Sequence, residues 1–203
     1  MNWFTHSGKV FKPFYPTLTW DKPTAEKKVY LTFDDGPTPE VTEYVLSVLK
    51  AYGFKATFFC IGENVAKNLA LYEKVKAEGH HIGNHTYTHV NGFHTSNSAY
   101  FEDTKRASEI IDSTLFRPPF GRIKRSQIRH IKQDFNIIMW SILSGDFDTS
   151  LDLHRAERRI KSLTKPGAIV VFHDSTKAYK NLKALLPKYC AYLTDKGYTS
   201  CGL

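Results

Sequence analysis

From Val29 onward the sequence alternates between short runs of β-branched and aromatic residues and longer stretches with helical periodicity. This alternation is typical of βα units, in which helices separate parallel strands. The first run, VYLTF at residues 29–33, is typical of a buried strand. Thr38 as N-cap and Pro39 at the first helical position then predict a helix that ends near Gly53.

The same pattern continues to the end of the chain, with no linker rich in Gly, Pro or Ser. Further strands are expected at 56–61, 81–82, 115–116, 137–140, 168–172 and 198–199, and further helices at 63–78, 99–113, 125–134, 152–164 and 177–195. About seven such repeats predict one α/β domain, a closed or nearly closed parallel barrel, over residues 29–203. Residues 1–28 lack clear periodicity and are assigned to an N-terminal lead-in segment that wraps this domain.

Composition excludes several classes of protein. No apolar run exceeds five residues, whereas a transmembrane helix needs about 18, so no integral membrane segment is expected. The first 30 residues contain no apolar signal-peptide core, which predicts a cytoplasmic protein or the mature form of an exported one. The net charge of +8 permits an anionic partner, but the basic residues form only isolated pairs and no nucleic-acid-binding motif. We therefore expect no nucleic-acid partner and a monomer.

The three cysteines form no CxxC motif, so a cysteine-based zinc site is not expected. Cys60 lies in an apolar run typical of a buried thiol. Pairing of Cys190 with Cys201 stays open at this point, because three cysteines do not define a disulfide framework.

Titratable side chains follow almost every predicted strand. In parallel α/β folds the functional site lies at the carboxyl ends of the strands, so these side chains would converge on one mouth. They are Asp34, Asp35, His85, His89, Arg117, Asp146, His173 and Asp174.

His85 and His89 are four residues apart, and in a helical turn both imidazoles would face one metal ion. On their own, two such histidines are more often structural than metal-binding. Asp34 and Asp35 change the balance, because two adjacent carboxylates at a strand end cannot both be buried unpaired at low cost. One can ligate a divalent cation while the other stays free as a base. Two histidines and one aspartate leave an open position for water or substrate, as in catalytic zinc sites.

Such a site would also need a proton donor for a leaving amine. His173 follows an apolar strand and lies where that acid is expected, with a satisfied structural histidine as the alternative. Asp146 could keep His173 charged, and Arg117 could orient the base carboxylate through a charge-assisted hydrogen bond.

Five ordered segments resemble the motifs of the NodB-type polysaccharide deacetylases, carbohydrate esterase family 4. They are TFDDGP at 32–37, HTYTH at 85–89, RPPFG at 117–121, the stretch from Trp140 to Asp146, and VFH at 171–173. The resemblance runs from about Val29 to the C-terminus and implies a distorted (β/α) barrel. It also implies a metal-dependent hydrolase that removes N-acetyl groups from N-acetylglucosamine-type glycans such as chitin oligomers or peptidoglycan.

The resemblance also implies a role for each matching residue. Asp34 would be the catalytic base, positioned by Arg117, and His173 the general acid, tuned by Asp146. One divalent ion, Zn²⁺ before Co²⁺, Ni²⁺ or Mn²⁺, would have as its ligands Asp35, His85 and His89. The remaining matches would bind the substrate: the backbone N–H of Phe120 would hold the oxyanion, while the acetyl methyl pocket would be lined by Trp140 and Val171.

The chain departs from the family pattern at four positions: His81, Leu143, Phe147 and Val171. These departures bear on substrate preference more than on the catalytic constellation. Two alternatives stay open. One is a deformylase or cyclic-amide hydrolase of small molecules on the same barrel, and the other is a carbohydrate-binding module that has lost catalysis.

Overall fold

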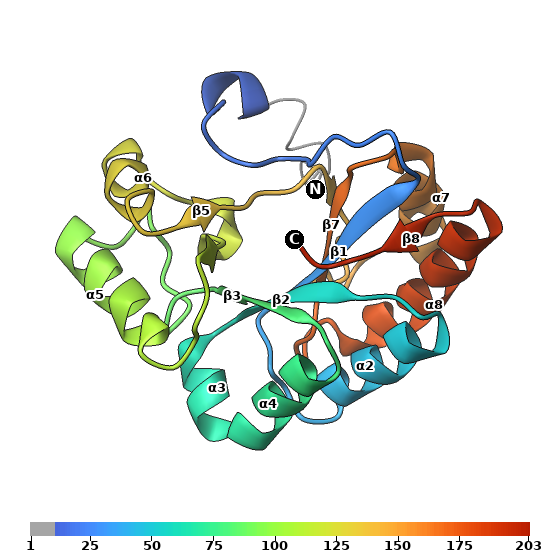
Figure 1. The fold of residues 1–203 in the computed structure, drawn as a ribbon, viewed down its shortest axis with the longest axis horizontal. Coiled ribbons are helices and arrows are strands. Elements are labelled where there is room, and N and C mark those ends of the chain that lie inside the picture. The colour runs from blue at the N-terminus through green and yellow to red at the C-terminus, as the bar shows by residue number, and fades with distance from the viewer. Residues whose placement is uncertain (1–10) are drawn as a thin grey trace.

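The computed structural model describes residues 11–203. One curled parallel sheet forms its centre, with strand order β5-β4-β3-β2-β1-β7-β6 and β8 beside β1 (Figure 1). The strands are β1 (Lys28–Asp34), β2 (Ala56–Cys60), β3 (His81–Asn84), β4 (Leu115–Phe116), β5 (Asn136–Ile137), β6 (Ile142–Leu143), β7 (Ile169–His173) and β8 (Thr199–Ser200). The seven strands from β5 to β6 form an incomplete parallel barrel, and β8 adds a short parallel strand beside β1. This confirms the predicted α/β class with about seven parallel strands.

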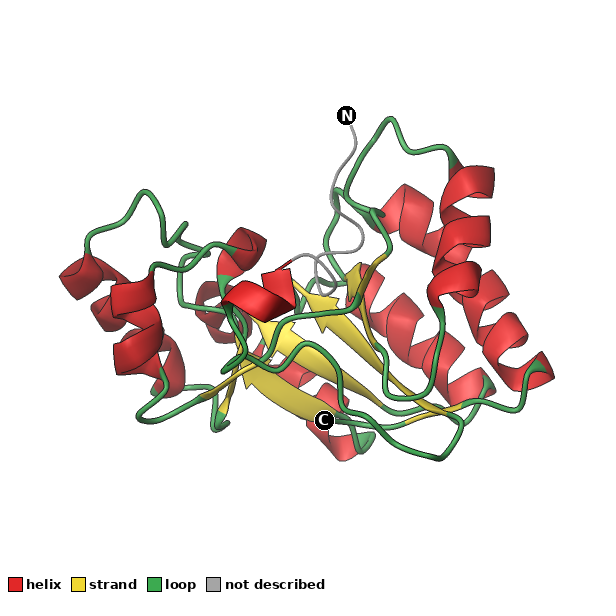
Figure 2. Ribbon diagram, turned by 90° about the horizontal axis from the view of Figure 1, so that it is seen from above, coloured by secondary structure: helices red, strands yellow, loops and turns green. Residues whose placement is uncertain are grey.

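Helices pack around the outside of the sheet, and the view at right angles shows the strands lying side by side between them (Figure 2). They are η1 (Lys12–Phe14), α2 (Val41–Ala51), α3 (Gly62–Lys67), α4 (Leu69–Ala77), α5 (Asn97–Ser108), η2 (Pro119–Gly121), α6 (Arg125–Ile131), α7 (Leu153–Leu163) and α8 (Tyr179–Asp195). No helix within residues 11–203 is long and apolar enough to cross a membrane.

The central strands β1 and β7 are buried on both faces, as expected of parallel strands that read as continuous apolar runs. They pair in a register that sets Asp34 opposite His173. Rings of Phe33, Phe58 and Phe172 pack against one another in the core beneath this pair. Packing of the apolar core therefore determines where Asp34 and His173 lie along their strands.

The described part of the lead-in segment bridges the open side of the barrel. Thr19 pairs with Ile138, just beyond β5, and Asp21 forms a bridge with Ala168, just before β7. Leu18 and Trp20 are buried in a second core cluster beside α5 and α6. Residues 18–21 therefore complete the packing where β5 and β7 are not joined directly; residues 1–10 of the predicted segment lie outside the described residues.

Several helix boundaries differ from the prediction: the helix expected over 99–113 is Asn97–Ser108, and the one expected over 125–134 ends at Ile131. Two further differences have a local cause. The first helix begins at Val41 rather than Pro39, because Glu40 has a φ of 65°, which interrupts a right-handed helix. The predicted helix over 63–78 is two helices, since Asn68 has an extended φ of −133° and its amide binds the Asn64 carbonyl. In the first case a backbone conformation, and in the second a side-chain contact, interrupts the helical periodicity.

The strand expected at 137–140 is also wrong in extent. It ends at Ile137, because the N–H of Met139 donates to Thr19 of the lead-in segment rather than to a neighbouring strand. The two-residue strand β6 was not predicted. Cys60, Cys190 and Cys201 are all free, so the open question of a disulfide is answered in the negative.

Candidate active site

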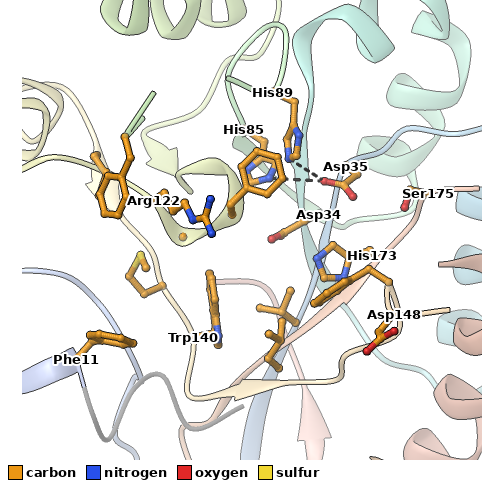
Figure 3. A pocket seen from close by; sticks show the side chains of 18 of the residues that line it. Phe11, Asp34, Asp35, His85, His89, Arg122, Trp140, Asp148, His173 and Ser175 are labelled. Atoms are coloured by element: carbon orange, nitrogen blue, oxygen red, sulfur yellow. Dashed lines mark ion pairs between the residues drawn. The ribbon is translucent and has the colours of Figure 1, made fainter. Parts of the chain in front are cut away.

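A cleft of about 860 Å³ opens at the carboxyl ends of the strands (Figure 3). Most of the predicted site residues line it, namely Asp34, Asp35, His85, His89, Phe120, Trp140, Val171 and His173. Arg117 and Asp146 are fully buried behind its walls, where Arg117 contacts the lining residue Asp34 and Asp146 contacts the lining residue His173. The lead-in segment supplies part of the apolar wall, including Leu18 and Trp20, which the sequence pattern gave no means to foresee.

Asp35, His85 and His89 meet at one side of the cleft. The Oδ1 atom of Asp35 lies 3.3 Å from Nε2 of His89 and 3.7 Å from Nε2 of His85. The Nδ1 atom of His85 lies 2.7 Å from the carbonyl oxygen of Arg117, which can only accept a hydrogen bond. Nδ1 therefore carries the proton of the neutral ring, and the Nε2 lone pair faces the Asp35 carboxylate. Two lone-pair donors turned toward each other suit a cation between them.

Protonation states agree with a cation site. Burial lowers the pKa of His85 to about 4, so this ring is neutral at physiological pH. Burial alone would raise the pKa of the Asp35 carboxyl, but His89, His173 and His85 together hold it below its usual value. A carboxylate and a neutral imidazole are the forms that bind metal ions. Asp35, His85 and His89 thus fit a divalent ion in residue type and mutual distance, and Asp35 and His85 also have the protonation states that bind one.

The backbone around this group is left-handed at four non-glycine residues. Asp35 has a φ of 83°, Thr86 of 65°, His89 of 58° and Phe120 of 60°. Such conformations cost about 1–3 kcal/mol each and concentrate at functional sites. The two histidines consequently lie on a loop rather than in a helical turn, contrary to the sequence-based expectation, yet their ring centroids are only 5.1 Å apart.

Asp34 is held by a buried arginine on one wall of the cleft. Nη1 of Arg117 donates to Oδ1 of Asp34 at 2.6 Å and to the hydroxyl of Thr32 at 2.8 Å. Nε and Nη2 of the same guanidinium donate to the carbonyl oxygens of Ile138 and Met139. The arginine is therefore held by two parts of the chain, β1 and the segment just after β5, and it leaves one side of Asp34 facing the cleft.

His173 is held by a buried carboxylate on the other wall. Its Nδ1 lies 2.7 Å from one oxygen of Asp146, and its backbone N–H donates to the other oxygen at 2.8 Å. Burial lowers the pKa of His173, but the charge and hydrogen bond of Asp146 more than reverse this and raise it to about 9. The ring edge of Phe147 packs at a centroid distance of 5.0 Å. Nε2 remains as the ring nitrogen that can act in the cleft.

Asp174 was noted in the sequence as a strand-end carboxylate but given no role. It is fully buried, and its oxygens accept hydrogen bonds from the Gly36 N–H and the Thr42 hydroxyl. Burial raises the pKa of Asp174 to about 7. Its place after His173 was the only signal of its proximity to the site, because the partners come from the loop after β1 and from α2.

The fold and the five motifs agree with the family suggested by the sequence. The chain belongs to the polysaccharide deacetylase family, whose sequence model matches residues 21–136. A peptidoglycan-N-acetylglucosamine deacetylase of Bacillus cereus is 34% identical over 92% of this chain and 92% of its own length. A chitooligosaccharide deacetylase of a Bradyrhizobium species is 33% identical over 73% of this chain and 71% of its own length.

A solved structure gives the same assignment. The crystal structure of a peptidoglycan N-acetylglucosamine deacetylase in complex with a naphthalenyl N-oxidanyl-benzamide superimposes with a TM-score of 0.82. That structure is 28% identical in sequence, and the match covers 96% of this chain and 94% of the other. The match to that structure therefore extends over nearly the whole of this chain, including the sheet that carries the cleft.

Proposed function

We propose that this chain is a metal-dependent N-deacetylase that releases acetate from N-acetylglucosamine-type glycans. The observation that carries the proposal is the meeting of three groups in one cleft: the Asp35–His85–His89 cluster, the Asp34–Arg117 pair and the His173–Asp146 pair. Amide hydrolysis needs an activated water, a base for its proton and an acid for the leaving nitrogen, and these groups supply each. The names of the relatives support the substrate class.

Asp35, His85 and His89 would hold one divalent ion, with Zn²⁺ proposed first because a carboxylate and two imidazoles with an open position suit it. When bound, such an ion polarises the acetyl carbonyl and makes a water more acidic. Co²⁺, Ni²⁺ and Mn²⁺ fit the same donor set and are the ions to test beside zinc.

Asp34 would accept the proton of the attacking water. The carboxylate is buried, and its Oδ1 atom is occupied by Nη1 of Arg117, so Oδ2 is the oxygen left to act as base. Arg117 also donates to the carbonyl oxygen of Met139, the residue before Trp140 in the cleft wall. The base and that wall are thus positioned by one side chain.

His173 would donate a proton from Nε2 to the leaving nitrogen, since Nδ1 is engaged by Asp146. A pKa of about 9 keeps the ring charged, and able to donate, at neutral pH. Trp140 and Val171 line the cleft, and we assign to them the pocket for the acetyl methyl group. The ring centroid of Phe120 lies 4.5 Å from that of His89, so Phe120 is next to the proposed metal ligands. We assign the binding of the oxyanion to its backbone N–H.

We also propose that residues 29–203 form the catalytic domain and that residues 1–28 belong to it as a supporting segment. Burial of Leu18 and Trp20 within the second core cluster supports this domain assignment. The described part of the segment, residues 11–28, thereby contributes to the cleft wall.

The test is acetate release from chitin oligomers, peptidoglycan and acetylated xylan, measured side by side with and without a chelator. We expect release from the first or second substrate, loss of activity with the chelator, and recovery on adding Zn²⁺. Activity that a chelator leaves unchanged contradicts the metal dependence. Absence of acetate from all three substrates favours the inactive carbohydrate-binding alternative, and turnover of formyl or cyclic amides alone favours the small-molecule one.

A further inference from the structure

Asp174 is a buried carboxylate that the proposed reaction does not use. Within residues 11–203 it forms no ion pair with a lysine, arginine or histidine, and its partners are a backbone N–H and a hydroxyl. A buried carboxylate without a cationic partner is destabilising unless its hydrogen bonds offset the lost hydration. The position of those hydrogen bonds shows what the carboxylate provides.

Asp174 binds the chain on both sides of Asp35. Its backbone N–H donates to the carbonyl oxygen of Asp34 at 3.0 Å, and its Oδ1 atom accepts the N–H of Gly36 at 3.1 Å. Its other oxygen is held by the hydroxyl of Thr42, at 2.5 Å, from the first turn of α2. The Thr42 hydroxyl thus holds the Asp174 carboxylate in the position from which it binds the loop.

Asn64, on α3, holds the same loop from the opposite direction. Its side-chain N–H donates to the carbonyl oxygen of Asp35 at 2.7 Å. The peptide group that joins Asp35 to Gly36 is therefore held at both ends, by Asn64 at its oxygen and by Asp174 at its nitrogen. The N–H of Ile61 adds a third contact, to the carbonyl oxygen of Gly36 at 2.9 Å.

The loop needs such support because Asp35 is left-handed, with a φ of 83°. A non-glycine residue relaxes from this conformation unless its surroundings determine it. Gly36 shows how close the fit is, since a Cβ atom there would overlap the carboxylate of Asp174. The direction of the Asp35 side chain toward His85 and His89 follows from this fixed backbone.

We propose that Asp174 and Asn64 are positioning residues that hold Asp35 in the orientation needed to bind the metal ion. The inference rests on the proposed function for the identity of the metal ligands. Contacts that orient ligands from behind typically change metal affinity by about 10–100-fold when removed. Both residues therefore act on metal affinity without touching metal or substrate.

The experiment measures the Zn²⁺ affinity of the full chain by competition with a chromogenic chelator, so that the readout does not depend on activity. We expect Asp174→Ala and Asn64→Ala each to weaken binding by about 10–100-fold. Asp174→Asn keeps an oxygen for the Gly36 N–H and should recover most of the loss. Ser200→Ala is the matched control, because it removes a buried hydroxyl that binds Lys55 at the opposite end of the sheet. It should lower thermal stability and leave Zn²⁺ affinity unchanged.

Wild-type affinity in both alanine variants overturns the proposal. So does an equal loss in Ser200→Ala, which would assign the effect to general loosening, or an equal loss in Asp174→Asn, which would assign it to charge. If Asp174→Ala does not fold, Asn64→Ala decides alone, since it changes no charge. A wild-type chain that binds Zn²⁺ but releases no acetate contradicts the proposed function only, and one that binds no Zn²⁺ overturns both.

Discussion

Each of the two walls of the cleft carries an ion pair, but the side chain that faces the cleft is the anion on one wall and the cation on the other. On one wall the proposed catalytic group is the carboxylate of Asp34. It is held by Arg117, which is fully buried and donates to four acceptors. On the other wall the proposed catalytic group is the imidazole of His173, which is held by the carboxylate of Asp146. An arginine stays charged at every working pH, whereas a histidine titrates. Under the roles proposed above, we expect the first wall to fix the geometry of the base and the second to set the pH range of the acid.

The largest expected effect separates Asp34 from its neighbour Asp35. Asp34→Asn should keep the metal and lose about 10²–10⁴-fold in kcat, because a positioned base is removed. Asp35→Asn should lose metal affinity as well, because a charged ligand is removed. Acetate release and metal content, measured on both variants, check this. Equal metal loss in the two variants would show that the base is misassigned.

The next effect tests whether the first wall is structural as well as catalytic. Arg117→Met should lower the free energy of unfolding by about 3–5 kcal/mol, since it leaves the buried Asp34 carboxylate without its cation. Chemical denaturation followed by circular dichroism measures the change. The exposed pair Lys67–Glu63 is the control, and Lys67→Met should change stability by less than about 1 kcal/mol.

A smaller, substrate-dependent effect is expected on the second wall. His173→Ala should reduce N-deacetylation by about 10²-fold or more, because the leaving amine must be protonated. Hydrolysis of an activated aryl acetate should fall much less, since its leaving group departs without that proton. Both substrates are assayed with the same enzyme preparation. Equal losses on the two substrates would return His173 to a structural role.

The smallest expected effect is a displacement of the pH profile. The pKa of His173 is raised to about 9 by Asp146, so the protonated acid is present below that pH and activity declines above it. Asp146→Asn removes the charge that raises the pKa, and the basic limb of kcat against pH should move to lower pH. An unmoved limb would mean that another group sets it.

The same pair predicts the pH dependence of stability. The folded-state pKa of His173 lies above its usual 6.5, so the stabilisation is complete below about pH 6.5 and is lost as the pH rises through 9. Unfolding measured at pH 6 and at pH 9.5 should show this loss in the wild-type chain and a smaller one in Asp146→Asn.

Elements whose conformation is determined by their own residues could be predicted from the sequence, whereas elements determined by distant neighbours could not. The strands β1, β2 and β7 are long apolar runs whose burial determines their conformation, and they were predicted almost to the residue. The strand β6 has two residues and is ordered by its neighbour β7, so no local pattern marks it. The helix start at Val41 was missed because the left-handed Glu40 that sets it has no signature in the sequence.

The candidate site divides in the same way. The titratable residues were found because they follow strand ends, whereas Phe120, Trp140 and Val171 were suggested only by the family resemblance. The structure places most of these residues in one cleft. The support from Asn64 was not foreseen, because its partner is a backbone carbonyl and backbone groups leave no trace in a sequence. The contribution of Leu18 and Trp20 to the cleft was equally hidden, since it depends on where an aperiodic segment lies in space.

The pairing of β1 with β7 has a consequence for how the chain folds. The hydrogen bond from Thr32 to Val170 joins residues 138 positions apart, and the Asp34–His173 pair lies on the same two strands. Such distant contacts close late, because the entropy of a long loop must be overcome first. When only the first half of the chain has been synthesised, one edge of β1 has no neighbouring strand. We expect this edge to be prone to aggregation until β7 has been synthesised and pairs with it. The two walls of the cleft therefore come together only in a nearly complete chain, and a fragment that ends before β7 contains the proposed base, Asp34, without the proposed acid, His173.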